Sequence, residues 1–212
     1  MPPTNWLSPG KAPNASRKAF ETARAHGGAP ADGVKRATVC DKANVLRSYA
    51  FFRKVCTEVA EEFPDIELEY AMVDALCAQL ISQPSHYGVI VAENIFGDIL
   101  SDLGPATAGS IGLSPTAETG NGVGYFQAAH GTAPDIAGKG IANPTGTILS
   151  SALMLDWLAP EHHDDRLLIA AHRIDKAVEA ALDEGAILTG DLGGSATSAE
   201  VVADLTKRFT AA

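Results

Sequence analysis

Two aspartates four residues apart, Asp98 and Asp102, follow a short apolar run at residues 88–92. If a helix begins near Gly97, both carboxylates lie on one helix face, one turn apart, at the carboxyl end of a predicted strand. Hard oxygen ligands in this arrangement suit Mg²⁺ or Mn²⁺. The same residues also fit a simpler interpretation, in which an aspartate caps a helix N-terminus and the pair lies on a solvated face.

A glycine-rich segment at residues 130–143 is a second candidate site. It reads His-Gly-Thr-Ala-Pro-Asp-Ile-Ala-Gly-Lys-Gly-Ile-Ala-Asn. Glycine permits positive φ and close backbone approach, so its N–H groups could face a phosphate or an adenine edge, and Asp135 could accept hydrogen bonds from ribose hydroxyls. The segment matches neither the G-x-G-x-x-G nor the Walker pattern, and an ordered surface loop has a similar composition.

Lys42 and Asp74 each follow a predicted strand. A divalent cation near a lysine lowers the lysine's pKa and lets the amine act as a base near neutral pH. Asp74 precedes the apolar segment at 75–80, where a carboxylate can serve a site or only cap a helix. Taken singly, Lys42 also fits a solvated surface lysine.

Apolar periodicity predicts the elements that must position these residues. We expect helices at 16–26, 47–63, 75–82, 98–104, 145–157 and 166–184, another starting at 197, and strands at 35–40, 66–73 and 88–92. Gly185 is placed to stop one helix, and Thr197 with Glu200 forms a capping-box pattern. Strands that alternate with helices predict an α/β fold.

Composition excludes several classes of protein. The net charge of -10, from 26 acidic against 16 basic residues, argues against a nucleic-acid partner. Cys40, Cys56 and Cys77 show no C-x-x-C spacing and are odd in number, which favours a reducing cytoplasm over a disulfide framework or a zinc site. No apolar run approaches the roughly 18–20 residues that span a bilayer, so no membrane association is expected.

Five segments occur together in the order they take in one enzyme family. They are Asp-Lys-Ala-Asn-Val-Leu at 41–46, Val-Asp-Ala-Leu-Cys-Ala-Gln-Leu at 73–80, Glu-Asn-Ile-Phe-Gly-Asp-Ile-Leu-Ser-Asp at 93–102, Gly-Ser-Ile-Gly-Leu at 109–113, and the glycine-rich segment with Pro144. With them the chain resembles the 3-isopropylmalate dehydrogenase family of β-decarboxylating hydroxyacid dehydrogenases, whose members also use isocitrate, homoisocitrate and tartrate. The likeness runs from about residue 19 to the segment at 191–197.

The resemblance implies an incomplete isopropylmalate dehydrogenase-like α/β fold, the C-terminal part of a two-domain architecture. It predicts part of a central dimerisation and metal domain at 16–108 and the C-terminal half of a cofactor domain at 109–212, while the Pro-, Asn-, Ser- and Gly-rich composition without apolar periodicity predicts a loosely ordered leader at 1–15. It implies that Asp74, Asp98 and Asp102 ligate Mg²⁺ or Mn²⁺, and that Lys42 and Asp74 are catalytic. The implied NAD-binding residues are Asn44, His130, Gly131, Thr132, Ala133, Asp135, Ile136 and Asn143.

The implied reaction is the oxidation of a 2-hydroxyacid by NAD⁺ followed by loss of CO₂, aided by the metal ion, within leucine biosynthesis. Asp135 favours NAD, because a carboxylate accepts from the ribose 2′-OH but repels the 2′-phosphate of NADP. In the family, Lys42 and Asp74 act across a homodimer interface with Asp98 and Asp102 of the other subunit.

The chain also departs from the family pattern. The family's N-terminal strand, the arginine cluster that grips the substrate and the tyrosine that protonates the enolate are not found before Ser16, so the resemblance implies an N-terminally truncated chain. Phe-Gln-Ala-Ala-His at 126–130 replaces the usual Phe-Glu-Pro-Val-His, and Gln127 removes a charge beside the loop. A second hypothesis is therefore a non-catalytic paralogue that acts as a dimerisation or nucleotide-binding module.

Overall fold

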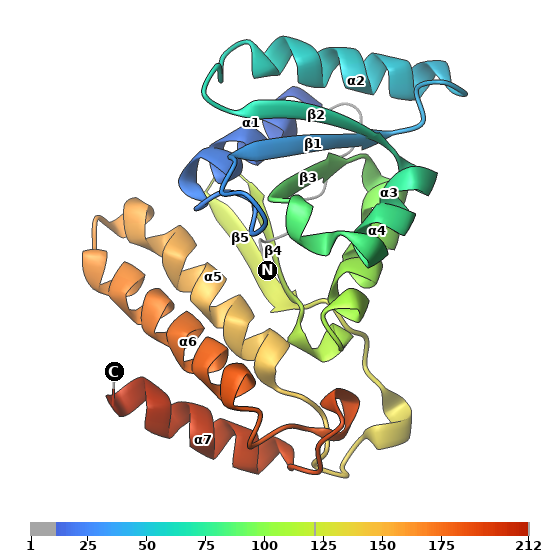
Figure 1. Cartoon of the computed structure of the whole chain (residues 1–212). Helices are drawn as coiled ribbons and strands as arrows, with labels where there is room; N and C mark the ends of the chain where they lie inside the picture. The colour runs from blue at the N-terminus through green and yellow to red at the C-terminus, as the bar shows by residue number, and fades with distance from the viewer. Residues whose placement is uncertain (1–11, 121, 212) are drawn as a thin grey trace. The chain divides into compact units, whose positions relative to one another are not determined.

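The computed structural model describes residues 12–120 and 122–211 and consists of two compact units, which meet in sequence between Thr107 and Ala108 (Figure 1). We call the part up to Thr107 unit 1 and the part from Ala108 unit 2. Each unit is built around its own packed elements. Among the described residues, none of the helices combines the length and the hydropathy of a membrane-spanning segment.

Unit 1 is a three-layer α/β/α arrangement around a parallel sheet. Its elements are α1 (Ala12–Ala25), β1 (Arg36–Asp41), α2 (Arg47–Ala60), β2 (Glu67–Met72), α3 (Val73–Ser82), the 3₁₀ turn η2 (Pro84–His86), β3 (Val89–Ala92) and α4 (Asn94–Thr107). The strand order is β2-β1-β3, with β1 parallel to both neighbours. All six residues of β1 are buried, as expected for a central strand covered on both faces.

Alternate residues of the sheet enter two separate cores. Ala37 and Val39 of β1 pack with α1 and α2, where Phe20 is fully buried. Cys40 packs with α3 and α4 on the opposite face, where Leu76 is fully buried. The period of two along a strand therefore places one pair of helices on each face, and it fixes the register of the sheet.

The carboxyl ends of the three strands lie at one edge of this sheet. The register pairs Asp41 with Met72 and Cys40 with Ala92. The residues that follow each strand therefore start from the same edge, where open α/β sheets place their ligands. This edge carries Lys42 after β1, Asp74 after β2 and Glu93 after β3.

Unit 2 combines an antiparallel hairpin with three helices. Its elements are η3 (Ile111–Leu113), β4 (Pro115–Gly120), β5 (Val123–Ala128), η4 (Pro134–Ile136), α5 (Thr145–His162), α6 (Asp165–Glu184), η5 (Gly190–Leu192) and α7 (Ser198–Ala211). Helix α5 packs on both hairpin strands and on α6, and α6 packs on α7 (Figure 1). The small core between α6 and α7 contains Val178, Val201 and Leu205.

The predicted α/β class is confirmed. The predicted helix stop at Gly185 and the predicted capping box of Thr197 and Glu200 are confirmed as well. Gly185 ends α6 with φ at 63°, a left-handed conformation that glycine adopts without steric cost. The backbone N–H of Thr197 donates to Glu200 Oε2 at 2.8 Å, and Glu200 N–H donates to Thr197 Oγ1 at 3.3 Å. This is the reciprocal capping box at the start of α7.

Two predicted helix starts lay three or more residues too late. Helix α1 begins at Ala12, and Ala15 is buried in the core, so residues 12–15 are not a loose leader. The remaining residues of that predicted leader lie outside the described part of the chain. Helix α4 begins at Asn94 rather than near Gly97, because Gly97 N–H already bonds to the carbonyl of Glu93.

Candidate functional site

Lys42 and Asp74 form an ion pair at the carboxyl edge of the sheet in unit 1. The distance from Lys42 Nζ to Asp74 Oδ1 is 2.5 Å. The parallel pairing of β1 with β2 explains the contact, because Lys42 follows β1 by one residue and Asp74 follows β2 by two. The hydrogen bond from Lys42 holds the pKa of the Asp74 carboxyl below its usual range, so Asp74 is a carboxylate at neutral pH.

A buried carboxylate that sequence reasoning missed anchors the turn after β1. Asp41 is fully buried and accepts hydrogen bonds from Arg53 Nε at 2.6 Å and Nη2 at 2.8 Å. Its Oδ1 also accepts from the backbone N–H of Ala43 at 2.9 Å, which forms an Asx turn. Asp41 therefore holds the backbone that presents Lys42 and Asn44, and Asn44 itself is exposed.

Asp98 and Asp102 lie on consecutive turns of α4, and both are exposed. Because α4 begins at Asn94, Asp98 is the fifth residue of the helix and Asp102 the ninth. The alternative that Asp98 only caps the helix N-terminus was therefore wrong. Two carboxylates at this spacing share one face, so both oxygen pairs are available to the same partner.

Within one chain, the three predicted metal ligands do not form a complete site. No cluster of three or more His, Cys, Asp or Glu side chains in the described ranges could hold a metal ion. Asp74 is instead committed through one oxygen to Lys42. The donor chemistry nevertheless fits a hard cation, because Asp74, Asp98 and Asp102 offer only carboxylate oxygens and are exposed.

A tyrosine and a glutamate occupy the same edge of unit 1. Tyr49 donates from its hydroxyl to Glu93 Oε1 at 2.7 Å and stacks on Phe96 with ring centroids 4.6 Å apart. Burial and the nearby Glu93 carboxylate raise the pKa of Tyr49 to about 12. This pair ties the start of α2 to the end of β3, and no sequence pattern indicated it.

The glycine-rich loop of unit 2 is open to solvent along most of its length. The residues predicted to contact NAD from His130 to Asp135 are all exposed, whereas Ile136 is half-buried. Ala133 adopts a left-handed conformation with φ at 41°, which is uncommon for a residue other than glycine. An exposed backbone of this kind has N–H groups available for the edges of a dinucleotide.

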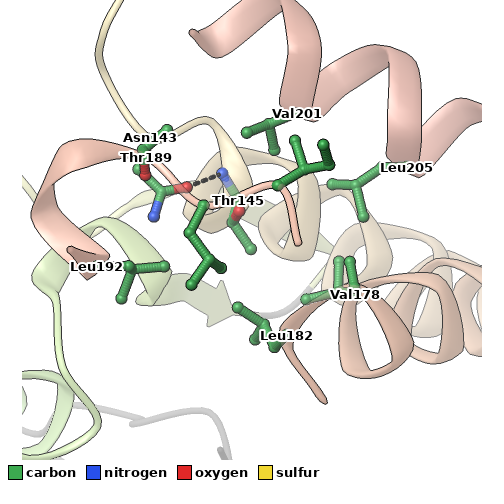
Figure 2. A pocket seen from close by; sticks show the side chains of 11 residues that line it. Asn143, Thr145, Val178, Leu182, Thr189, Leu192, Val201 and Leu205 are labelled. Atoms are coloured by element: carbon green, nitrogen blue, oxygen red, sulfur yellow. Dashed lines mark hydrogen bonds between the residues drawn. The ribbon is translucent and has the colours of Figure 1, made fainter. Parts of the chain in front are cut away.

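Asn143 differs from the other predicted loop residues because it is buried. Its Oδ1 accepts from the backbone N–H of Thr145 at 3.0 Å, drawn as a dashed line in Figure 2. The cavity beside it, which Thr189 and Leu192 also line, has a volume of about 20 Å³. That is room for about one water molecule, so this cavity cannot hold a nucleotide.

The sequence matches a model of a protein family over residues 12–209, and that model is described as isocitrate/isopropylmalate dehydrogenase. The chain belongs to the isocitrate/isopropylmalate dehydrogenase family. The match includes both units and every predicted site residue. Members of this family are dehydrogenases, and the structural relatives include a β-decarboxylating one.

Two curated relatives in this family illustrate the likeness in sequence. The 3-isopropylmalate dehydrogenase of Zymomonas mobilis is 46% identical over 189 residues, which are 88% of this chain and 50% of that protein. The probable NAD isocitrate dehydrogenase subunit alpha, mitochondrial, of Caenorhabditis elegans is 41% identical over 197 residues, which are 92% of this chain and 51% of that protein. The chain thus spans about half the length of these relatives.

Solved structures show the same relationship in three dimensions. Isocitrate dehydrogenase from Methylococcus capsulatus has a TM-score of 0.82 at 35% identity, and the match covers 96% of this chain and 57% of that one. A β-decarboxylating dehydrogenase from Thermococcus kodakarensis has a TM-score of 0.80 at 40% identity, covering 97% of this chain and 56% of that one. The predicted isopropylmalate dehydrogenase-like fold, represented here in part, is confirmed.

Proposed function

We propose that this chain contributes the metal-binding carboxylates and the adenosine-binding loop for NAD-dependent oxidative decarboxylation of a 2-hydroxyacid of the 3-isopropylmalate type. The observation that carries the proposal is the Lys42–Asp74 ion pair at the carboxyl edge of the sheet. A lysine held against an ionised carboxylate at a strand end combines a proton-handling amine with a metal-type oxygen ligand. The family membership supplies the reaction type.

The donor set of unit 1 supports Mg²⁺ or Mn²⁺ as the metal. Asp74 stays ionised because of Lys42, and its side chain is exposed, so it remains accessible to a second partner. Asp98 and Asp102 offer two more carboxylates from one face of α4. When bound, the cation supplies positive charge that favours loss of CO₂ from a β-keto acid, and NAD⁺ accepts the hydride.

The role of Lys42 in this proposal is to take the proton of the substrate hydroxyl at its Nζ atom, which it can do only as the neutral amine, after its own proton has passed to solvent. The Asx turn at Asp41 fixes the backbone on one side of Lys42, and Asp74 holds the ammonium end. The amine is therefore restricted to the sheet edge before a substrate arrives. Such positioning reduces the entropic cost of bringing the amine and the substrate hydroxyl into the geometry for proton transfer.

The exposed loop of unit 2 supports NAD as the dinucleotide. Gly131, Gly138 and Gly140 leave open space where a side chain would stand, so a ligand can approach the backbone closely. The Asp135 carboxylate is exposed and suits the ribose hydroxyls of NAD, but it would repel the 2′-phosphate of NADP. His130 Nδ1 bonds locally to the Gly131 carbonyl at 3.0 Å, which orients the ring at the start of the loop.

A homodimer with shared active sites would complete the metal site. Asp74 lies on α3, whereas Asp98 and Asp102 lie on α4, and a single chain does not gather three metal ligands within its described residues. Two isoleucines of α4 are strongly exposed, Ile95 at 61% and Ile99 at 51%. Apolar side chains at such exposure beside functional carboxylates favour burial against another subunit. A cytoplasmic location and the absence of nucleic-acid and membrane partners stay predictions from composition.

The test is to incubate the purified chain with NAD⁺, Mg²⁺ and, in turn, 3-isopropylmalate, isocitrate and tartrate, and to follow NADH absorbance. We expect turnover with one of them, its abolition by Asp98→Asn, and no effect of Glu61→Gln, which alters an exposed carboxylate at the end of α2. No turnover with any substrate would refute the enzymatic proposal for this chain.

The alternative function is a non-catalytic dimerisation or nucleotide-binding module. The observation that favours it is that the chain spans about half the length of its curated relatives. Isothermal titration calorimetry separates the two proposals. Binding of NAD⁺ or Mg²⁺ without turnover supports the module, and binding with turnover contradicts it.

A further inference from the structure

The carboxylate of Asp191 joins three segments of unit 2 that are far apart in sequence. It accepts hydrogen bonds from Ser110 Oγ, from Thr189 Oγ1 at 2.5 Å and from Asn143 Nδ2 at 3.0 Å. Burial alone would raise the pKa of Asp191, but the donors from Ser110, Thr189 and Asn143 outweigh burial and hold the pKa below its usual range. Asp191 is therefore a charged acceptor at neutral pH.

This contact fixes the orientation of Asn143, the last residue of the glycine-rich loop. The Asn143 amide donates from Nδ2 to Asp191, while its Oδ1 accepts from the N–H of Thr145, the first residue of α5. An amide that uses its two ends in this way has no freedom to flip. Asn143 is 9% exposed, so water cannot readily replace either partner.

The packing around these two side chains leaves no room for adjustment. A Cβ atom on Gly112 would lie 2.8 Å from Asn143 Cβ and 3.0 Å from Asp191 Oδ2. Real Cβ atoms do not approach other atoms this closely, so residue 112 must be glycine for the cluster to exist. The Gly112 N–H also donates to Ser110 Oγ at 2.9 Å, which orients that hydroxyl toward Asp191.

A second anchor holds the same end of the loop. The N–H of Ser198 donates to the carbonyl of Gly140 at 2.8 Å, and Ser198 Oγ donates to the carbonyl of Ala142 at 2.5 Å. Residues 140–143 are thus bound by the C-terminal segment 189–198, whereas residues 131–135 are exposed. One end of the loop is fixed and the remainder is presented to solvent.

We propose that Asp191 is a positioning residue for dinucleotide binding: through Asn143 it holds the glycine-rich loop in the conformation that receives the adenosine half of the cofactor. This inference rests on the proposed NAD-binding function and adds a residue to it that does not itself touch the ligand. A loop held in its bound conformation before the ligand arrives loses less entropy on binding. Replacing Asp191 by asparagine keeps the shape but removes the charge and leaves one acceptor oxygen in place of two, so the side chain can no longer accept from all three groups as Asp191 does.

The experiment compares Asp191→Asn with Asp183→Asn, a matched change at an exposed carboxylate in the last turn of α6. Hydrogen–deuterium exchange of residues 130–144 is measured on the full chain, and calorimetry gives its dissociation constant for NAD⁺. We expect Asp191→Asn to speed exchange in the loop and to raise the dissociation constant about ten-fold or more, and Asp183→Asn to change neither. Ser110→Ala, which removes one of the three donors to the Asp191 carboxylate, should show the same effects at smaller size and serves as the test if Asp191→Asn fails to fold.

Two kinds of result would overturn the proposed role of Asp191 or part of it. Unchanged loop exchange in Asp191→Asn, or faster exchange with unchanged NAD⁺ affinity, would overturn the positioning role. A wild-type chain that does not bind NAD⁺ would overturn the proposed cofactor and the ligand part of this inference. The exchange measurement would then decide by itself whether Asp191 holds the loop.

Discussion

Replacement of Asp41 by asparagine should be one of the most destabilising conservative changes in unit 1. The Asp41 side chain is fully buried, while the Arg53 side chain that pairs with it is 29% exposed. Asparagine keeps an oxygen for the N–H of Ala43, but it brings an N–H₂ group and no charge to the guanidinium. Arg53 then loses its bond from Nε and keeps only the bond from Nη2, which now goes to an uncharged oxygen.

The magnitude follows from this geometry. Removing one partner of a buried ion pair typically costs about 3–5 kcal/mol, because the other charge stays buried without compensation. Water can reach part of Arg53, and its guanidinium also lies over the Tyr70 ring at 4.8 Å from the centroid, so some of that cost is recovered. We expect a loss of about 2–3 kcal/mol in the free energy of unfolding.

Urea denaturation followed by circular dichroism measures this loss, and the chain offers a matched control. Arg24 binds Asp65 through the same two nitrogens, Nε and Nη2, but both side chains are about half exposed. Asp65→Asn should leave the urea midpoint nearly unchanged, because solvated ion pairs contribute little. A midpoint shift for Asp41→Asn no larger than that of Asp65→Asn would refute the reasoning.

Three further predictions concern ionisation, reactivity and capping. Since the folded pKa of Tyr49 is about 12 against 10.0 for a free tyrosine, stability should be lost as pH rises from about 10 to 12. Buried Cys40 and Cys56 add to that loss, so Tyr49→Phe should reduce it in pH-dependent thermal melts without removing it. Cys40 and Cys56 are buried with pKa values raised by burial to about 12 and about 11, so a thiol reagent at neutral pH should titrate Cys77 first and the other two only after denaturation. Thr197→Ala should lower the free energy of unfolding by about 1 kcal/mol in urea titration, because it removes the N-cap hydroxyl of α7. An unchanged midpoint would contradict the claim that this cap stabilises the fold.

The sequence predicted well wherever one local signal decides the structure. The continuous apolar run at 88–92 predicted a strand, and β3 is that strand. The Gly185 stop and the Thr197–Glu200 capping box were visible as residue types at fixed spacing, and both are confirmed. These signals work because the hydrogen bonds that they describe join residues within one turn of each other.

Contacts between distant residues could not be predicted in this way. The Asp41–Arg53, Tyr49–Glu93 and Asp191–Asn143 pairs join residues 12, 44 and 48 positions apart, and nothing in their local patterns names the partner. The start of α4 was also misplaced, because the glycine at residue 97 indicated a boundary whereas the structure buries it inside the helix. Tertiary packing, rather than helix propensity, decides that position.

The division between Thr107 and Ala108 has a consequence for how such a protein can change over time. The carboxylates Asp74, Asp98 and Asp102 are encoded on one side of that boundary, and the glycine-rich loop with Asp191 on the other. A single recombination event at the boundary would transfer the proposed metal ligands without altering the proposed cofactor loop, and each unit would keep its own packed core. Under the proposed roles, metal preference and dinucleotide preference can therefore be inherited separately.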